Sequence, residues 1–549
     1  MSKRRVPLGE CDRLSPKCDD FVTKARRAEL GGRELEVKLA VAADDLERLA
    51  GASVLLDRAL GSTRRELVST YFDTPDGRLC RRGVALRVRR IGRRRVQTLK
   101  GPSSGTGAAA DRPELEVSIE SDTPDLAAFR DPLAFELAGL VLPGELVPVF
   151  TTRIERTTLE VAWPSLEHRE AIVAVALDRG RILADGKEET ISEVELELAR
   201  GAARALFALV EELRAIAPVS FETRDKATRG YALALDLAPP PRKASRLVLD
   251  PEGSIAAGFR RIGAAGLAHA LANLAPAADG RDPEGVHQLR VALRRLRSAF
   301  SLFRPLLADG DRERFNGDMR WLLGELGPAR DHDVLASELL AAIEPIGALA
   351  HERAILGELL REGRAALHER VRSALESRRA AELWLDLAAW FELDRFRENA
   401  PEPARFDEPL RPFAAERLQK RWRRVKKLGR NFDRLDAEDR HRLRIALKKL
   451  RYGAEFLGSL WPETQVKKLV VACADLQDRL GHLNDGTVAT RLAREVLAAA
   501  GADPRVPSAG LALGAVIGWH ARAERRVLRQ AAAFLDELLA IEPFWRERA

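Results

Sequence analysis

Three consecutive prolines, Pro239–Pro241, divide the chain into two parts with different sequence patterns. They lie in Ala238–Lys243, which we expect to be a stiff polyproline-type linker because proline restricts the backbone and lacks an N–H donor. Before the prolines, alternating apolar and charged residues predict β-strands. After them, segments rich in Ala, Leu and Arg with helical spacing predict helices. The division therefore predicts an α+β domain followed by an all-α domain.

The length of 549 residues is too great for a single core and allows this two-domain organisation. We expect a disordered basic extension at residues 1–30, a first domain at 31–236, a Pro-rich linker at 237–250 and a helical domain at 251–549. Within the helical domain we expect two repeats, at about 254–380 and 405–549.

Composition excludes several classes of protein. The chain is 46% hydrophobic and 32% charged, as in soluble globular proteins, and its formal net charge is only +8. Four scattered cysteines form neither a disulfide framework nor a paired zinc site, which favours a reducing compartment. No apolar run approaches the roughly 20 residues that a membrane helix needs. We therefore expect a cytoplasmic protein without a membrane partner.

The stretch Glu34–Leu39 has the alternation typical of a β-strand. Side chains two residues apart point to the same face, so Glu34, Glu36 and Lys38 share one face. Taken alone, this pattern is typical of an edge strand whose charged face meets solvent. Further strands with charged faces of both signs would instead indicate a charged cavity that requires a ligand.

Seven later segments have strand-like patterns, and two have helical ones. The strands are expected at 66–72, 84–90, 96–100, 114–119, 150–161, 171–178 and 191–198, and the helices at 44–60 and 202–213. The charged or polar residues that share one face within a strand are Arg87 and Arg89; Thr98 and Lys100; and Glu193, Glu195 and Glu197. An antiparallel barrel with apolar residues outside and charge inside accounts for all of them. Its interior would attract a polyphosphate, and its carboxylates would hold Mg²⁺ or Mn²⁺.

Six motifs occur in the order seen in CYTH domains, the family of triphosphate tunnel metalloenzymes. They are Glu34-x-Glu36-x-Lys38, Tyr71-Phe72-Asp73-Thr74, Leu86-Arg87-Val88-Arg89, Thr98-Leu99-Lys100, Glu193-x-Glu195-x-Glu197 and Lys226-Ala227-Thr228-Arg229-Gly230-Tyr231. Residues 33 to about 236 resemble this family. The resemblance implies an eight-stranded antiparallel tunnel barrel and metal-dependent hydrolysis of a triphosphate, or in some members cyclisation of ATP to cyclic AMP.

The resemblance also implies roles for the charged residues. The catalytic residues would be Glu34, Glu36 and Lys38. The phosphate-binding residues would be Lys38, Arg87, Arg89, Lys100, Arg156 and Lys226. The metal ligands, or residues that orient the attacking water, would be Glu34, Glu36, Glu193, Glu195 and Glu197. Arg156 and Arg153 lie on opposite faces of their strand, and Arg156, followed by two threonines, looks more like the family's arginine. Asp178 and Glu116 are further candidates.

The helical part contains an internal repeat with an offset of 154 residues. His287-Gln288-Leu289-Arg290 recurs as His441-Arg442-Leu443-Arg444, and Arg294-Arg295-Leu296-Arg297 recurs as Lys448-Lys449-Leu450-Arg451. In each copy the His and three cations fall on one helical face, beside an apolar face. Residues 417–451 carry 15 Lys and Arg against four Asp and Glu, which indicates a polyanion partner. The repeat predicts a duplicated helical bundle.

These helices resemble the CHAD domain, a helical family linked to inorganic polyphosphate, over about residues 250–549. The motif is His-x-x-Arg-x-x-x-Arg-Arg-x-Arg, followed by Leu-Gly and by Arg330, Asp331 and Asp333. The resemblance implies polyphosphate binding by His287, Arg290, Arg294, Arg297, His441, Arg444, Lys448 and Arg451. The second copy departs from the motif at Asn484 and Thr487, so we expect Asp331 and Asp485 to be structural.

The sequence thus predicts a CYTH–CHAD protein that hydrolyses inorganic triphosphate with Mg²⁺ or Mn²⁺ and binds polyphosphate, with a location in the cytoplasm or at polyphosphate granules. One alternative is a non-catalytic polyphosphate-binding scaffold. Another is a nucleoside or thiamine triphosphatase or an adenylate cyclase. Nucleic acid is a poorer partner because few aromatic residues accompany the basic ones. The oligomeric state stays open.

Overall fold

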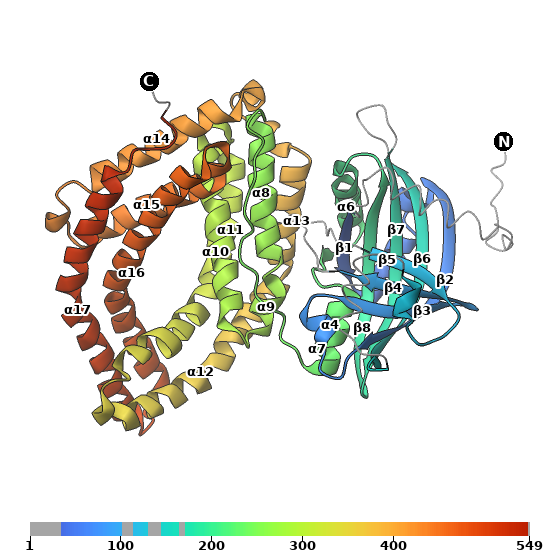
Figure 1. Ribbon diagram of the computed structural model, residues 1–549, viewed down its shortest axis with the longest axis horizontal. Coiled ribbons are helices and arrows are strands. Elements are labelled where there is room, and N and C mark those ends of the chain that lie inside the picture. The colour runs from blue at the N-terminus through green and yellow to red at the C-terminus, as the bar shows by residue number, and fades with distance from the viewer. Residues whose placement is uncertain (1–34, 102–113, 130–143, 164–170, 547–549) are drawn as a thin grey trace. The chain divides into compact units, whose positions relative to one another are not determined.

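The computed structural model describes residues 35–101, 114–129, 144–163 and 171–546, except for the side chains of residues 484–487 (Figure 1). These residues form two compact units, one that ends at Leu235 and one that begins at Asp236. The first contains an antiparallel β-sheet and the second consists of helices (Figure 1). The predicted fold class, an antiparallel sheet domain followed by a duplicated helical bundle, is confirmed.

The first unit is built on one sheet with the strand order β5–β4–β3–β2–β6–β7–β8–β1–β9, in which every neighbouring pair is antiparallel. The strands are β1 (Glu36–Val41), β2 (Ala59–Asp73), β3 (Ala85–Ile91), β4 (Arg94–Lys100), β5 (Glu114–Ile119), β6 (Val147–Trp163), β7 (Ala171–Ala184), β8 (Lys187–Arg200) and β9 (Val219–Phe221). The long strands β2, β6, β7 and β8 form the centre of this sheet.

The sheet has nine strands, so the predicted number of eight was wrong. The additional strand, β9, pairs with the last residues of β1. Its three residues are too few to display an alternating pattern, which is why the sequence did not reveal it. Among the described residues no pairing joins β5 to β9, so these two strands are the edges of the hydrogen-bonded sheet.

The predicted helix at 44–60 was too long. It consists of α2 (Ala43–Ala50) and α3 (Ser53–Leu56), and β2 begins at Ala59. Gly51 ends α2, where its backbone N–H donates to the Glu47 carbonyl and that of Ala52 donates to the Leu49 carbonyl. The apolar residues that follow continue the helical spacing, but pairing of β2 with β6 over most of its length overrides it.

Apolar side chains cover one face of β1 and β8 and charged side chains the other. Leu39 lies opposite Val194 across the two strands, and both are fully buried. Helices α2 and α6 (Arg204–Ile216) pack on this part of the sheet. Because side chains alternate, the charged residues of the same strands lie on the opposite face.

Helix α7 (Lys226–Leu235) packs on the sheet through Ala227 and Tyr231, in a cluster with Tyr71 and Phe150. The Tyr71 and Phe150 rings stack, with centroids 4.3 Å apart. Gly230 lies directly against Phe150, and a Cβ there would overlap the aromatic ring. The absence of a side chain at residue 230 therefore lets α7 approach the sheet closely.

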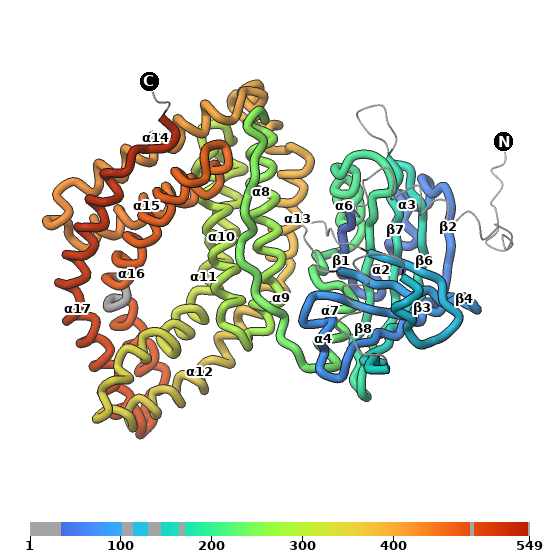
Figure 2. Tube along the Cα trace, viewed as in Figure 1, coloured from blue at the N-terminus to red at the C-terminus, as the bar shows by residue number. Residues whose placement is uncertain are grey.

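The second unit contains two copies of a helical arrangement, traced in Figure 2 from α8 in green to α17 in red. The helices are α8 (Ile255–Leu271), α9 (Leu274–Asp279), α10 (Pro283–Phe303), α11 (Asp309–Val334), α12 (Ala350–Glu376), α13 (Arg378–Glu392), α14 (Leu410–Leu428), α15 (Ala437–Leu457), α16 (Glu463–Ala500) and α17 (Val506–Ala540). Both bounds of α10 reappear in α15 with a displacement of 154 residues. Asp282 and Asp436, one residue before each helix, both cap it through the side chain: Asp282 accepts from the backbone N–H of Glu284, and Asp436 from that of Asp439.

The Pro-rich segment before α8 has no regular secondary structure, and its C-terminal part packs on the helices. The backbone of Arg242 exchanges hydrogen bonds with the side chain of Asn273. Leu247 and Leu249 are buried, and the Leu249 backbone N–H donates to Ser459. This segment is therefore held to the second unit rather than extended freely into solvent.

Candidate functional site

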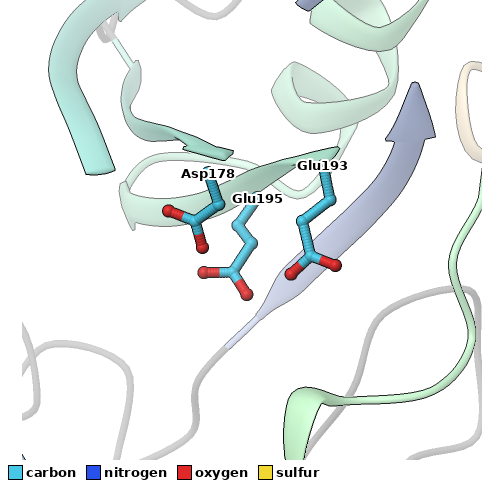
Figure 3. Close-up of side chains that lie close together, drawn as sticks. All are labelled: Asp178, Glu193 and Glu195. Carbon is cyan, nitrogen blue, oxygen red and sulfur yellow. The ribbon is translucent and has the colours of Figure 1, made fainter. Parts of the chain in front are cut away.

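The register of the central strands gathers three carboxylates on the charged face of the sheet. Asp178 on β7 lies directly opposite Glu193 on β8, and Glu195 follows two residues later on β8. All three residues are buried, and their carboxylates point to the same side of the strands (Figure 3). One oxygen from each lies within 4.8 Å of the others. Oxygen donors in this arrangement suit a hard divalent cation, so the residues present fit a metal ion.

Two other predicted metal ligands, Glu36 and Glu197, are not among these three buried carboxylates. Glu36 on β1 and Glu197 on β8 face each other across the two strands and are partly exposed. Asp178, which was only a further candidate from the sequence, takes their place in the buried group. Glu34 lies outside the described residues.

The ammonium of Lys226 lies among the three carboxylates. Its Nζ is 2.7 Å from Asp178 Oδ2 and 2.7 Å from Glu195 Oε1, and it also pairs with Glu193. Burial opposes the charged form of Lys226, but the negative charges of Glu195, Asp178 and Glu193 outweigh burial and raise its pKa. The positive charge of Lys226 thus offsets part of the negative charge of this acidic group.

The carboxylates respond differently to this environment. Burial opposes ionisation of Glu195, but the charges of Lys226, Lys38 and Arg156 hold its pKa well below the ordinary value. The pKa of Asp178 is lowered, since Lys226 and Arg156 outweigh burial. Burial dominates at Glu193 and raises its pKa. Glu195 and Asp178 therefore carry negative charge at neutral pH, whereas Glu193 binds a proton more readily.

Lys38 and Arg156 border the acidic group from the neighbouring strands β1 and β6. Lys38 Nζ is 3.1 Å from Glu195 Oε1 and 3.4 Å from Glu36 Oε2. The Arg156 guanidinium donates two hydrogen bonds to Asp178, of 2.7 and 2.6 Å, and a further one to Glu195. Arg153 is exposed. Of the two strand arginines, Arg156 is thus the one that contacts the acidic group.

A second group of cations lies on β3 and β4. Lys100 Nζ is 2.8 Å from Glu114 Oε2, and Arg87 Nη2 is 3.5 Å from Glu114 Oε1. Burial opposes ionisation of Glu114, but Lys100 and Arg87 lower its pKa to about 2. Arg89 donates to the hydroxyl of Ser69 at 3.1 Å. Burial and the charges of Arg87 and Arg156 lower the Arg89 pKa to about 10, so cations of both groups act on Arg89.

Two residues that the sequence did not single out support these groups. Glu114 contacts both Lys100 and Arg87, and its sequence signal was that it shares a strand face with Glu116. Arg229 on α7 is buried and donates to Glu193 Oε2 at 2.9 Å, to Glu189 Oε1 at 2.8 Å and to the Thr190 carbonyl. Its signal was the motif that also contains Lys226.

In the helical unit, α10 and α15 contact each other and bring their cations together. Burial, followed by the positive charges of Arg444, Arg294, Arg451 and Arg290, lowers the pKa of Lys448 to about 7. Two of these arginines belong to α10, so cations of both repeats act on one lysine. No described acidic side chain forms an ion pair with Arg294 or Lys448. This excess of positive charge is suited to binding a polyanion.

Other predicted polyphosphate-binding residues are partly engaged in the fold. Arg290 Nη1 donates to the Leu323 carbonyl of α11 at 2.8 Å, and burial lowers the Arg290 pKa to about 10. Arg297 Nε donates to Asn316 at 3.3 Å. Arg451 Nε lies 3.5 Å from Glu455 of its own helix. His287 is half-buried and His441 is exposed.

Part of the basic segment 417–451 is structural. Arg417 and Arg421 of α14 are buried. Arg417 donates to the Leu302 carbonyl at 2.9 Å, and Arg421 donates to the carbonyls of Lys449 and Ser298. These two arginines tie α14 to α10 and α15, so they do not contribute free cations.

The acidic residues of the repeated motif form ion pairs with arginines. Arg491 Nη2 pairs with Asp331, and Arg364 Nε lies 3.0 Å from Asp333 Oδ1. The pairing of Asp331 with Arg491 agrees with the structural role that we expect for Asp331. The side chain of Asp485 lies outside the described residues.

Comparisons with known proteins agree with both sets of motifs. Residues 32–231 match the CYTH domain and residues 261–494 match the CHAD domain. An inorganic triphosphatase from Haemophilus influenzae is 32% identical over 206 residues, which are 37% of this chain and 55% of that protein. The chain therefore spans about half the length of this curated relative.

Solved structures include relatives of each unit. The CHAD domain from the plant Ricinus communis is 30% identical, with a TM-score of 0.48, over 55% of this chain and 98% of that one. A putative adenylyl cyclase from Hippeastrum, reported to have a dominant triphosphatase activity, is 18% identical, with a TM-score of 0.28, over 36% of this chain and 95% of that one.

No helix within the described residues combines the length and the apolar character needed to cross a membrane. The two domain matches follow each other along the chain in the order of the sheet unit and the helical unit. With a CYTH domain at residues 32–231 and a CHAD domain at residues 261–494, the chain belongs to the CYTH–CHAD proteins.

Proposed function

We propose that the sheet unit is a triphosphatase that hydrolyses inorganic triphosphate with Mg²⁺ or Mn²⁺. The observation that carries this proposal is the buried acidic group Asp178, Glu193 and Glu195, bordered by the cations Lys38 and Arg156 on the same face of the sheet. A triphosphate carries several negative charges, and phosphoryl transfer depends mainly on positioning and on neutralisation of charge. The inorganic triphosphatase relative supports the same activity.

In this proposal the cations and the carboxylates have separate tasks. Arg87, Arg89 and Arg156 supply planar forks for phosphate oxygens, while Lys38, Lys100 and Lys226 supply point charges. Asp178, Glu193 and Glu195 hold the metal ion, which when bound supplies positive charge that neutralises phosphate oxygens. Glu36, which is partly exposed beside Lys38, orients the attacking water. The roles of Glu34 and Glu197 are proposed from the motif alone.

A substrate panel tests this activity and separates it from the alternatives. The full-length protein is incubated with Mg²⁺ or Mn²⁺ and inorganic triphosphate, thiamine triphosphate, ATP or long polyphosphate, and released phosphate is measured. We expect the fastest release from inorganic triphosphate. Loss of this release in Glu36→Gln and Lys38→Ala would support the site, and an intact fold without turnover of any compound would favour the non-catalytic scaffold. Cyclic AMP formed from ATP would favour the cyclase.

A matched pair of variants tests the side of the sheet on which the reaction takes place. Arg156 contacts Asp178 and Glu195, whereas Arg153 lies three residues away on the same strand and is exposed. We expect Arg156→Gln to lose most of the triphosphatase activity and Arg153→Gln to retain it. Equal activity of the two variants would contradict the proposed site.

We also propose that the helical unit binds inorganic polyphosphate through the α10–α15 cluster, defined as Arg290, Arg294, Arg297, Arg444, Lys448 and Arg451 with His287 and His441 beside them. The overlap of positive charge at Lys448 supports this proposal. Trp422 is only 2% exposed, so α14 offers no aromatic ring for stacking on bases, which disfavours single-stranded nucleic acid. We expect Arg294→Gln with Lys448→Gln to weaken polyphosphate binding, measured by competition against DNA at fixed salt. The location in the cytoplasm or at polyphosphate granules stays a prediction.

A further inference from the structure

The outer face of α14 carries positive charge that neither the fold nor the proposed sites use. Six exposed cations lie within eleven residues: Lys420, Arg423, Arg424, Lys426, Lys427 and Arg430. None of the six forms an ion pair with a described acidic residue, and residues 417–432 contain no Asp or Glu. Four of them recur at the spacing of one helical face, and we call these four the α14 basic face: Lys420, Arg423, Arg424 and Lys427.

The α14 basic face is exposed, unlike its counterpart in the first repeat. The positions 154 residues earlier, in and just after α8, are Gly266, His269, Ala270 and Asn273, and the last three of these are buried. The four α14 positions lie on the surface instead. Like charges three and four residues apart repel each other and destabilise a helix. A polyanionic partner that neutralises the four cations would remove this repulsion.

The α14 basic face is connected to the α10–α15 cluster by further positive charge. Arg421, on the inner side of α14, bonds to carbonyls of both α10 and α15 and holds the three helices together. Lys449 lies at this junction. Burial, followed by the charges of Arg421, Arg297, Arg424 and Arg304, lowers its pKa. Positive charge thus continues from Arg297 on α10, past Lys449, to Arg424 on α14.

We propose that the α14 basic face is a second polyanion-binding surface, which takes the part of a long polyphosphate chain that extends beyond the α10–α15 cluster. This proposal rests on the proposed function of the helical unit. A linear polymer of phosphates needs only a continuous series of cations, which these helices provide. Lys420 to Lys427 spans about 10 Å of helix, enough to add several phosphate contacts. The α10–α15 cluster alone would hold short chains, so the α14 basic face would favour long ones.

Two matched variants of the full-length protein test this surface. One changes Lys420, Arg423, Arg424 and Lys427 to Gln. The control changes four arginines of α17 to Gln: Arg522, Arg525, Arg526 and Arg529. These arginines are exposed and have the same spacing, and their substitution removes the same charge. Affinity for short and for long polyphosphate is measured over a range of salt concentrations. We expect the α14 variant to bind long chains about tenfold or more weakly, with a log–log salt slope lower by about 3, because each neutralised cation releases a counterion. Its affinity for short chains should equal that of the unchanged protein.

Three results would overturn the proposal: unchanged affinity of the α14 variant for long chains, an equal loss in the α17 control, or a loss confined to duplex DNA or anionic vesicles. A protein that binds polyphosphate of neither length would instead refute the proposed function. If the α14 variant does not fold, the surface is tested in the unchanged protein by measuring how far polyphosphate protects its lysines from acetylation. Long chains should protect Lys420 and Lys427 and short chains should not, and the absence of protection would refute the surface.

Discussion

Lys226 Nζ lies 2.7 Å from Glu195 Oε1, so a lysine of the protein itself holds the carboxylates that a metal ion would use. Two cations that need the same oxygens compete, since their charges repel each other at this distance. We therefore expect Lys226→Gln to bind Mn²⁺ more tightly than the unchanged protein when no phosphate is present, by about tenfold, measured by electron paramagnetic resonance of free Mn²⁺. Weaker Mn²⁺ binding would show that Lys226 organises the carboxylates rather than competing for them.

The same variant should be less stable without metal. Its stability distinguishes a loss of competition for the carboxylates from a general disruption of the fold. Removing one partner of a buried ion pair costs about 3 to 5 kcal/mol because the other charge stays buried. We expect the melting temperature of Lys226→Gln to fall in a chelator and to recover more than that of the unchanged protein when Mn²⁺ is added. Lys187→Gln is a suitable control because Lys187 is exposed and bonds only to a backbone carbonyl among the described residues.

The α10–α15 cluster should bind polyphosphate in a pH-dependent manner. The pKa of Lys448 is about 7, below its ordinary value of 10.5, so above pH 7 the free protein loses this proton whereas the unfolded chain retains it. Deprotonation of Lys448 therefore increases the free energy of unfolding as pH rises from 7 to 10.5. Phosphate binding, in contrast, requires the charged form of Lys448. We expect affinity to fall up to about tenfold per pH unit above pH 7. In Lys448→Arg, which stays charged, affinity should vary little; the same decline in this variant would contradict the role of Lys448.

Glu114 should contribute to acid sensitivity of the sheet unit. Its pKa of about 2 lies below the ordinary value of 4.5, because Lys100 and Arg87 outweigh burial. A carboxylate with a lowered pKa stabilises the fold above pH 4.5, and the stabilisation is lost as the pH falls toward 2. The difference corresponds to about 3 kcal/mol. We expect the free energy of unfolding from urea titrations to fall less steeply between pH 5 and 3 in Glu114→Gln. The exposed Glu120→Gln should follow the unchanged protein.

Side-chain alternation made the sheet's charged face predictable from the sequence. A strand has a period of two residues, so Lys38 and Glu195 could be assigned to charged faces before their 3.1 Å contact was known. The repeat was equally informative, since the displacement of 154 residues appears in both bounds of α10 and α15. Features that recur with a regular period along the chain could thus be predicted from the sequence.

Contacts between distant segments were not predictable in the same way. The position of Lys226 depends on how α7 packs across the sheet. No local sequence pattern predicts which carboxylates its side chain contacts. Net charge was also misleading in α14, where Arg417 and Arg421 turn inward to backbone carbonyls. The three-residue β9 was too short to have a period. Each of these features is determined by tertiary packing, which overrides the local signal.

Packing of α7 on the sheet can be tested at Gly230. Residue 230 lies against the Phe150 ring, and a Cβ would overlap the ring, so Gly230→Ala must shift α7 or Phe150. Overpacking of this kind costs about 1 to 3 kcal/mol. A shift of α7 also moves Lys226, at its first turn, relative to Asp178 and Glu195. We therefore expect Gly230→Ala to lower both the free energy of unfolding and the triphosphatase activity. Gly61→Ala, with nothing within 4 Å of the added Cβ, is the matched control, and an equal effect of both substitutions would refute the close contact.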